Sequence, residues 1–294
     1  MNAALLLARL RSLPSSLAYV RKHPMGRRDP LGVVLRMARW HVGNLARSGL
    51  RPYPWVGGST LLAEPGMTGV TGNIYYGLHE FVEMAFIAML LRPGDLFGDV
   101  GANAGTYSIL ASKVAGARTV AFEPNGPIRA VLERQLYANA IAGLVSVRDQ
   151  AIGDRPGSVR FSTSLGTMNH IVDGAAAQAV EVEMTTLDAA FAGEPPLALK
   201  LDIEGAEDRA IAGAKALLGG PELRAILIET VGDASLRALT GAGFAELHFD
   251  PFARALGDAP TSYPQNNRLF VRDVPFVRER LATAPALDVL GLKL

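Results

Sequence analysis

DLFGDVGANAGTYSILASKVAGARTVAFEPN, the stretch Asp95–Asn125, decides how the rest of the chain can be interpreted. It begins with a short apolar run, Leu96–Val100, which predicts a buried strand. The small residues of Gly101–Gly105 then allow the main chain to turn tightly. Apolar residues at helical spacing predict a helix over Thr106–Val114, and a second apolar run predicts a strand over Arg118–Phe122. This order of elements is typical of a nucleotide-binding β-α-β unit.

An acidic residue lies near the end of each of these strands. Asp99 is two residues before Gly101, and Glu123 follows the second strand, eighteen residues after Gly105. A carboxylate at the position of Glu123 can accept hydrogen bonds from both hydroxyls of a ribose. Asn103 replaces the middle glycine of the dinucleotide pattern, and a carboxylate beside the turn disfavours a pyrophosphate. The pattern therefore favours S-adenosylmethionine, which carries a positive sulfonium and amine, although a glycine turn in an unrelated α/β protein is the simpler alternative.

Four separated motifs follow one another along the chain: FGDVGANAGTYS, VAFEPN, TTLD and LKLDIEGAE. Together they closely resemble the FkbM family of S-adenosylmethionine-dependent methyltransferases, over residues 72–272. The resemblance implies O-methyl transfer to a hydroxyl, either of a sugar in a glycan or glycolipid or of a polyketide-type natural product. It also implies a small β insertion over the active site, between the alternating segments Val159–Ser162 and Val180–Thr185.

Strands that alternate with helices predict a parallel sheet with ligands at the carboxyl ends of the strands. We expect an α/β fold of the class I methyltransferase (Rossmann-like) type. It would have a seven-stranded, mostly parallel, doubly wound sheet, a helical N-terminal extension and a small β insertion. The expected domains are the extension at 1–65, the methyltransferase domain at 66–275 and a C-terminal tail at 276–294. Further strands are expected at 144–152, 197–203, 225–229, 244–249 and 268–272, the last pairing antiparallel at the end of the sheet.

The segment before the first core strand is harder to interpret. Arg51–Pro54 is interpreted as a linker, the region Gly69–Tyr76 as short strands or loops, and Gly77–Leu91 as a helix. The resemblance places the segment from Tyr75 to Glu80 beside the cofactor, while His79 and Glu80 are also ordinary residues for the first turn of a helix. The residues expected to bind S-adenosylmethionine are Glu80, Asp99, Gly101, Ala102, Asn103, Gly105, Thr106, Glu123, Pro124, Asn125, Gln150, Ala151 and Asp202.

Methyl transfer to a hydroxyl needs a group that accepts the hydroxyl proton. The catalytic candidates are His170, in the inserted loop, and the acids Asp202 and Glu204 after a predicted strand. Glu204 is equally suited to an N-terminal position of the following helix. Asp202 and Glu229 end neighbouring strands and are weak candidates for a magnesium site, because two acids are too few. We expect no metal.

The first 51 residues differ in charge from the rest. They hold ten Lys or Arg and one acid, a net +9, while the remainder holds 19 basic and 27 acidic residues, a net −8. Helical spacing over Leu5–Val20 and Leu31–Leu50 predicts two amphipathic helices whose arginines are solvated or contact an anionic membrane surface or a second subunit. The absence of cysteine and of a convincing signal peptide favours a cytoplasmic protein, possible at the inner membrane face, and no apolar run predicts a membrane-spanning helix.

Two other functions remain open. One is an NAD-dependent nucleotide-sugar oxidoreductase on a similar sheet, although no Tyr-x-x-x-Lys pair is present. The other is a non-catalytic glycan-binding module that retains the fold. The expected partner is a small-molecule or glycan acceptor. We expect no nucleic-acid partner, and the sequence is compatible with a homo-oligomer.

Overall fold

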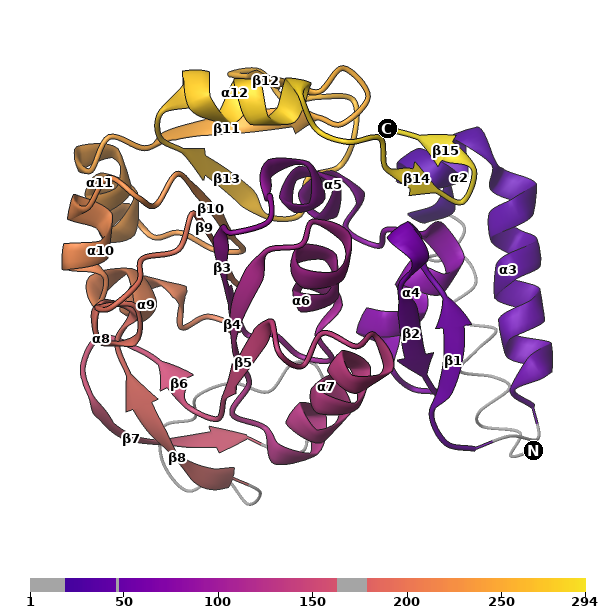
Figure 1. Ribbon diagram of the computed structural model, residues 1–294, viewed down its shortest axis with the longest axis horizontal. Coiled ribbons are helices and arrows are strands. Elements are labelled where there is room, and N and C mark those ends of the chain that lie inside the picture. Colours follow the sequence, from indigo (N-terminus) through magenta and orange to yellow (C-terminus); the bar gives the residue numbers. More distant parts are fainter. Residues whose placement is uncertain (1–18, 46–47, 163–178) are drawn as a thin grey trace.

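The computed structural model describes residues 19–45, 48–162 and 179–294. Their central strands are Leu96–Val100 (β3), Arg118–Phe122 (β4), Val145–Arg148 (β5), Ala198–Leu201 (β9), Ala225–Ile228 (β10), Ala245–Asp250 (β11), Ala255–Gly257 (β12) and Arg268–Val271 (β13). Within the described residues these eight strands form one sheet in the order β12-β11-β13-β10-β9-β3-β4-β5 (Figure 1). The strands from β10 to β5 run parallel, and β13 runs antiparallel to both β10 and β11. The expected α/β fold with a mostly parallel sheet is confirmed.

The sheet differs from the expectation in two places. The strand β12 adds an eighth member by pairing antiparallel with β11 at the sheet edge. The antiparallel strand β13 lies between β10 and β11 rather than at the end of the sheet. Its last three residues are fully buried, as an interior strand requires.

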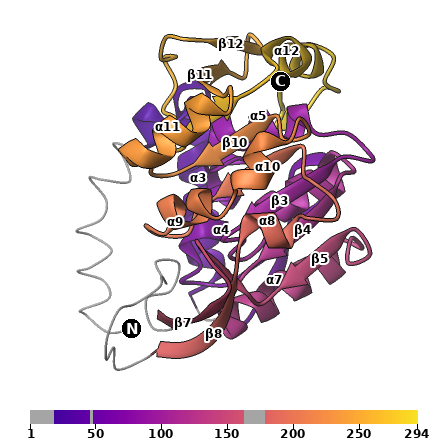
Figure 2. The same ribbon diagram turned by 90° about the vertical axis from the view of Figure 1, so that its left-hand side faces the viewer.

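Helices cover both faces of this sheet (Figures 1 and 2). One face carries Phe81–Leu90 (α5), Thr106–Ile109 (α6) with its continuation Leu110–Val114 (η2), and Gly126–Ala138 (α7). The other carries Leu187–Ala190 (α8), Glu207–Ala212 (α9), Lys215–Gly219 (α10) and Asp233–Gly241 (α11). Side chains alternate along β10 so that Leu227 packs with the first helices and Ile226 with the second. The doubly wound arrangement therefore rests on two apolar cores, one on each face.

The predicted β insertion is present. It consists of Ala151–Ile152 (β6), Gly157–Ser162 (β7) and Ala179–Thr185 (β8), with β8 paired between the other two. The single strand expected at 144–152 is divided, because β5 belongs to the central sheet and β6 to this smaller one. The loop that carries His170 lies outside the described residues.

The segment before the central sheet contains more regular structure than expected. Arg51–Pro54 is a strand (β1), not a linker, and it pairs antiparallel with Thr60–Ala63 (β2). Pro52 and Pro54 lack the N–H that a ladder needs, which suits β1 to an edge position. The region expected as strands or loops is the helix Thr68–Tyr76 (α4), and the helix expected from Gly77 is α5, which begins only at Phe81.

Two side-chain amides fasten β2 to the methyltransferase core. Gln135 on α7 accepts from Leu62 N at 2.7 Å and donates to Leu62 O at 2.8 Å. One turn later, Asn139 accepts from Thr60 N and donates to Thr60 O, both at 2.8 Å. These contacts imitate the ladder of a neighbouring strand, so α7 supplies the partner that the second edge of β2 would otherwise lack.

The N-terminal helices are Pro24–Arg28 (α2) and Pro30–Gly43 (α3), and α3 ends seven residues before the expected Leu50. Asp29 begins α3 by accepting from Gly32 N at 2.9 Å. At the other end of the chain, Val274–Ala282 (α12) packs against α5, and Asp288–Val289 (β14) pairs with Leu292–Lys293 (β15). The division into three domains at residues 65 and 275 stays a prediction.

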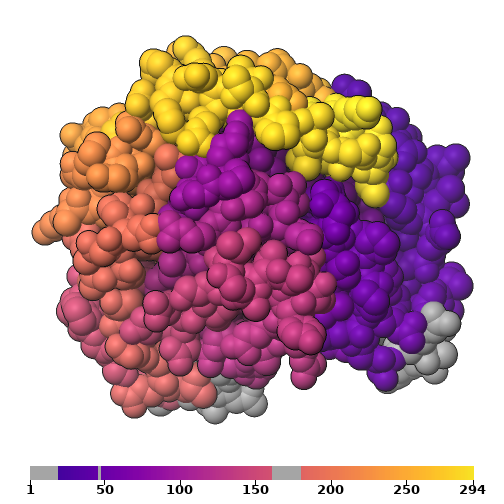
Figure 3. Space-filling view, in the orientation of Figure 1, coloured from indigo at the N-terminus to yellow at the C-terminus, as the bar shows by residue number. Residues whose placement is uncertain are grey.

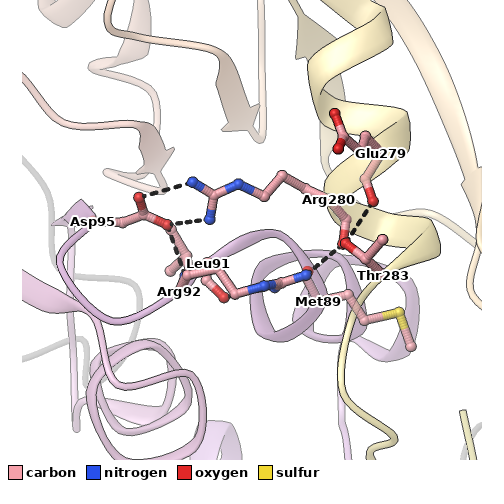
Figure 4. A network of polar contacts seen from close by, with 7 residues as sticks. All are labelled: Met89, Leu91, Arg92, Asp95, Glu279, Arg280 and Thr283. Atoms are coloured by element: carbon pink, nitrogen blue, oxygen red, sulfur yellow. Dashed lines mark hydrogen bonds and ion pairs between the residues drawn. The ribbon is translucent and has the colours of Figure 1, made fainter.

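An ion pair holds α12 on the core (Figure 4). Arg280 Nη1 lies 2.9 Å from Asp95 Oδ2, just before β3. Arg92 donates to the main-chain oxygen of Arg280 and to that of Met89, so it joins the end of α5 to α12. The C-terminal helix is thereby fixed to the same segment that leads into the first core strand.

We predict that Gln135→Ala lowers the free energy of unfolding by about 1–3 kcal/mol, because it leaves the N–H and C=O of Leu62 without their partner. Urea unfolding measures this loss. The matched control is Arg134→Ala, an exposed position on the same helix, which should change the stability by less than about 0.5 kcal/mol. Equal effects of the two variants would show that the amide contacts contribute nothing.

Candidate active site

The turn after β3 has a main-chain shape that restricts its sequence. Gly101 and Gly105 both have φ of 82°, and Asn103 has φ of 50°. A Cβ on Gly101 would lie 1.8 Å from Asp202 O, so this position admits only glycine. Asn103 tolerates the left-handed conformation better than most residues, and its Oδ1 accepts from Ala104 N at 2.7 Å. The turn therefore brings bare main chain to the carboxyl ends of β3 and β9.

Glu123, at the end of β4, organises this turn. Its Oε2 accepts from Asn103 N at 2.9 Å and its Oε1 accepts from Asn125 N at 2.8 Å. Burial raises the pKa of Glu123 to about 7, while the two main-chain donors oppose the shift. Each carboxylate oxygen has a second lone pair, so both can still accept a hydrogen bond from a ligand hydroxyl.

A cavity of about 310 Å³ opens over the turn and the ends of β3, β4 and β9. This volume is typical of a small-molecule site. Most of the residues expected to bind the cofactor line it: Glu80, Asp99, Gly101, Ala102, Asn103, Thr106, Glu123, Pro124, Gln150, Ala151 and Asp202. Glu204 also lines it, with residues of α4 and β6 on opposite walls. The structure thus brings together segments that are far apart in the sequence.

Two expected residues support the cavity without lining it. Gly105 begins α6, and a Cβ there would lie 2.2 Å from Leu132 Cδ1, so glycine allows α7 to pack closely. Asn125 begins α7 by accepting from Ile128 N. Both residues therefore position helices beside the cavity and do not contact a ligand in it.

A buried lysine lies at the floor of the cavity. Lys200 is on β9 directly beside Asp99 on β3, and its side chain is 3% exposed. Lys200 Nζ donates to Asp202 Oδ2 and lies 4.6 Å from the centre of the Tyr107 ring. Ser108 Oγ donates to Asp99 Oδ2 at 2.7 Å. One ammonium therefore holds a cluster of carboxylates at the point where the two strands end.

Charge and burial compete within this cluster. Burial alone would lower the pKa of Lys200, but the carboxylates of Asp202, Glu80 and Asp99 outweigh it and raise that pKa above its usual range. Burial raises the pKa of Asp99, against the opposing effect of Lys200. For Asp202, burial is outweighed by Lys200, and the pKa falls below its usual value. Lys200 and Asp202 are therefore a charged pair at neutral pH.

Tyr107 extends the cluster to the start of α5. Its hydroxyl donates to Glu80 Oε2 at 2.6 Å. Burial, together with Glu80 and Glu83, raises the pKa of Tyr107 well above its usual value, so the phenol stays protonated. Glu80 is the residue that precedes α5, and the sequence expectation that it lies at the cavity agrees with its position.

Glu207 accepts hydrogen bonds from the main chain of the loop that follows β9. Its Oε1 accepts from Ile203 N at 2.9 Å, and its Oε2 accepts from Gly205 N and Thr230 Oγ1. Glu204 between them has φ of 53°, an uncommon conformation for this residue type. Glu207 thus stabilises a strained loop that carries two of the catalytic candidates.

Glu229 is exposed and lies outside the cavity wall. Partial burial and the carboxylates of Asp202, Glu204 and Glu207 raise the pKa of Glu229 to about 7. In the part of the chain that the structure describes, no group of three acidic or histidine residues could hold a metal ion.

His79 lines the opposite wall and is supported by the N-terminal segment. Tyr19 Oη donates to His79 O at 3.0 Å, and His23 Nε2 donates to Leu78 O at 2.9 Å. Burial lowers the pKa of His23 to about 4 and also lowers the pKa of His79, so both rings are neutral at pH 7. A Cβ on Gly72 would lie 2.4 Å from His79 Nδ1, which shows how closely α4 holds this ring.

The sequence reasoning placed the carboxylates correctly at strand ends but missed the residues that hold them. Lys200 carried a signal, because a lone lysine within the apolar run of β9 must find a buried partner. Tyr107 and Ser108 gave no sequence signal of a role in the site, because both are ordinary residues of a first helical turn. His79 was placed beside the cofactor only by the family resemblance, and His170, the preferred base, lies outside the described residues.

We predict that Lys200→Met lowers the free energy of unfolding by about 3–5 kcal/mol at neutral pH, because it leaves buried carboxylates without a cation. The lowered pKa of Asp202 stabilises the fold above its unfolded pKa of about 3.9, and this contribution is lost as pH falls through the folded value. The loss caused by the substitution should therefore shrink on acidification. Urea unfolding across pH measures it, with the exposed Lys215→Met as the matched control, and a loss independent of pH would contradict the charge argument.

One family domain and several solved structures are similar to parts of this chain. The Methyltransferase FkbM domain matches residues 99–233. No curated protein sequence matches the chain. Among solved structures, similar folds include the methyltransferase FkbM from Methylobacillus flagellatus KT, with 15% identity and a TM-score of 0.42 over 71% of this chain and 61% of that one. An rRNA methylase from Streptococcus thermophilus has 14% identity and a TM-score of 0.39, over 64% of this chain and 91% of that one.

An RNA methyltransferase from Salinibacter ruber, in complex with S-adenosylhomocysteine, has 13% identity and a TM-score of 0.35 over 66% of this chain and 91% of that one. The domain match spans Asp99, Glu123, Lys200 and Asp202, so it covers both the glycine turn and the lysine cluster. Residues 99–233 of this chain are therefore a methyltransferase FkbM domain.

Proposed function

We propose that the protein is an S-adenosylmethionine-dependent O-methyltransferase that acts on a sugar hydroxyl of a glycan or glycolipid. A hydroxyl of a natural product is the second acceptor class. The observation that carries the proposal is the set of carboxyl groups on the cavity wall, which it shares with one cation, Lys200: Glu80, Asp99, Glu123, Asp202 and Glu204. Such a wall suits a ligand with a sulfonium and an amine and disfavours a pyrophosphate. The methyltransferase FkbM domain supports the same chemistry.

The residues present fit this cofactor. Glu123 offers spare acceptor capacity on both carboxylate oxygens for the ribose, and the glycine at 101 lets a ligand approach the main chain. The acidic cluster around Asp99 and Asp202 would face the positive end of the ligand. Gln150 and Ala151, at the start of the β insertion, would contact the base from the other wall. When bound, S-adenosylmethionine supplies an activated methyl group for in-line displacement.

The chain's own contribution is mainly positioning. The fixed carboxylates orient the donor for in-line displacement. Asp202 is held ionised by Lys200, so it is a weak base but a suitable acceptor for a hydrogen bond from the acceptor hydroxyl. We assign proton acceptance to His170, with Asp202 as its rival and Glu204 as an acceptor-positioning residue.

Two rival functions predict different ligands. An oxidoreductase would bind NAD, whereas the proposed enzyme binds S-adenosylmethionine and S-adenosylhomocysteine, so calorimetry with the three ligands separates them. A non-catalytic glycan-binding module would bind a glycan without catalysing methyl transfer. Mass spectrometry of glycans from cells with and without the gene, seeking a shift of one methyl group, tests both the reaction and the acceptor. The proposal places the reaction in the cytoplasm, where the cofactor is available.

We predict that Glu123→Gln weakens S-adenosylmethionine binding by about 1–2 kcal/mol, because a charged acceptor becomes a neutral one. The raised pKa of Glu123, about 7, adds a pH dependence. Ribose hydroxyls donate to the ionised carboxylate, so wild-type affinity should gain relative to the variant as pH rises through that value. Calorimetry measures both effects, and the exposed Glu133→Gln is the control. Identical affinities at all pH values would remove the ribose assignment.

We predict that His170→Ala lowers kcat by roughly 10² to 10⁴ while cofactor affinity holds. The wild-type kcat should rise through a pKa of about 6–7. The comparison variants are Asp202→Asn, expected to disturb placement, and His79→Ala, expected to keep the pH profile. If the His170→Ala enzyme retains kcat and the pH profile, the role moves to Asp202 or His79. Activity lost to a chelator and restored by magnesium would favour a metal site near Asp202 and Glu229.

A further inference from the structure

Helix α3 is apolar on two opposite faces. Val33 and Trp40 point into the protein and are 0% and 5% exposed. Five large aliphatic side chains lie in the solvent: Leu31 (69%), Val34 (44%), Leu35 (53%), Val42 (68%) and Leu45 (61%). At 3.6 residues per turn the helical members share one side of α3, and Leu45 follows two residues after its end. We call these five residues the aliphatic stripe.

The segment that carries the aliphatic stripe is rich in cations. The described residues 19–45 contain six Lys or Arg and one acid, Asp29. Arg36 pairs with Asp29 at 3.1 Å. The other five cations are exposed: Arg21, Lys22, Arg27, Arg28 and Arg39. Arg39 lies on α3 at one edge of the stripe, so its charge would sit beside any surface that the stripe contacts.

We propose that the aliphatic stripe and its cations dock the protein on an anionic lipid surface, with α3 lying in the plane of the interface. An exposed apolar face flanked by Lys and Arg is the pattern of helices that bind this way. None of the described helices is long and apolar enough to cross a membrane. Docking therefore means contact with one leaflet. The docking proposal does not depend on the proposed methyl-transfer reaction.

Charge argues against two other partners for the aliphatic stripe, a second copy of the chain and the chain's own first 18 residues. A symmetric dimer would place two copies of this basic segment against each other, and like charges at an interface are unfavourable. The first 18 residues of the chain carry Arg9 and Arg11 and no acid, so they too lack complementary charge. The surface is also a convex helix of Leu and Val with no aromatic anchor among the five, whereas protein interfaces concentrate energy in Trp, Tyr and Arg. Fluid acyl chains need no such anchor or matching shape.

The position of α3 leaves it free to make this contact. It forms one outer edge of the molecule, the indigo edge in the space-filling view (Figure 3). On its inner side α3 packs against α4, and the first residues of α4 line the cavity. A lipid surface at α3 would therefore lie one helix away from the candidate active site.

The test is sedimentation of the full-length protein with vesicles. We expect binding to vesicles of phosphatidylcholine with phosphatidylglycerol and little binding to phosphatidylcholine alone. The double variant Leu35→Gln/Val42→Gln should lower the partition coefficient about tenfold or more, because each buried methylene contributes roughly fourfold. The control Tyr137→Gln removes an 84% exposed aromatic side chain from α7 and should bind as the wild type does. High salt should weaken binding by screening the cations.

Three results would overturn the proposal. Absence of binding to the anionic vesicles is the first, and equal binding of the double variant and the wild type is the second. The third is self-association in analytical ultracentrifugation that the double variant abolishes, without any vesicle binding, which would assign the stripe to a second copy of the chain. Calorimetry with S-adenosylmethionine shows separately whether each variant remains folded and whether the proposed function holds.

Discussion

The candidate site depends on the burial of one ammonium group in the middle of the sheet. Lys200 cannot stay charged there without carboxylates around it, because burial alone would lower its pKa. The carboxylates come from three different elements: Asp99 from β3, Asp202 from the loop after β9, and Glu80 from the start of α5. Their attraction to one cation fixes these elements relative to each other. The same constraint leaves an excess of negative charge at the cavity floor, where a cationic ligand can use it.

A second constraint joins the glycine turn to the strand that follows it. Glu123 accepts from the main chain of Asn103 in the turn and from that of Asn125 at the start of α7. Gly101 in turn lies so close to Asp202 that no Cβ fits. The turn, the end of β4 and the loop after β9 are therefore in direct contact, and Glu123 lines the same cavity as the lysine cluster.

The sequence predicts those features of the fold and the site that are encoded in adjacent residues. It does not predict features that depend on contacts between distant segments. The β-α-β unit from Leu96 to Phe122 was predicted correctly because strand, turn and helix are each encoded in adjacent residues. The helix α4 was missed because Gly69 and Gly72 weaken a helical pattern. Packing against His79 explains Gly72, and no local pattern shows that contact. The place of β13 inside the sheet is set by pairing on both sides, which no local pattern encodes. In the same way, the acids at strand ends and the lone lysine of β9 could each be found in the sequence, but their contact depends on the packing of separate elements.

The N-terminal extension supports the wall of the site and also presents an exposed surface. Tyr19 and His23 bind the main-chain oxygens of His79 and Leu78, and Arg36 Nε donates to Tyr75 O at 2.7 Å. The inner face of the extension thus holds the segment between α4 and α5, whose residues line the cavity. Helix α3 itself contacts α4 through the bond from Arg36 to Tyr75, so the aliphatic stripe and the cavity lie on opposite sides of one helix-on-helix contact. The inner face of α3 packs against α4, and its outer face carries the aliphatic stripe that we propose to meet an anionic lipid surface.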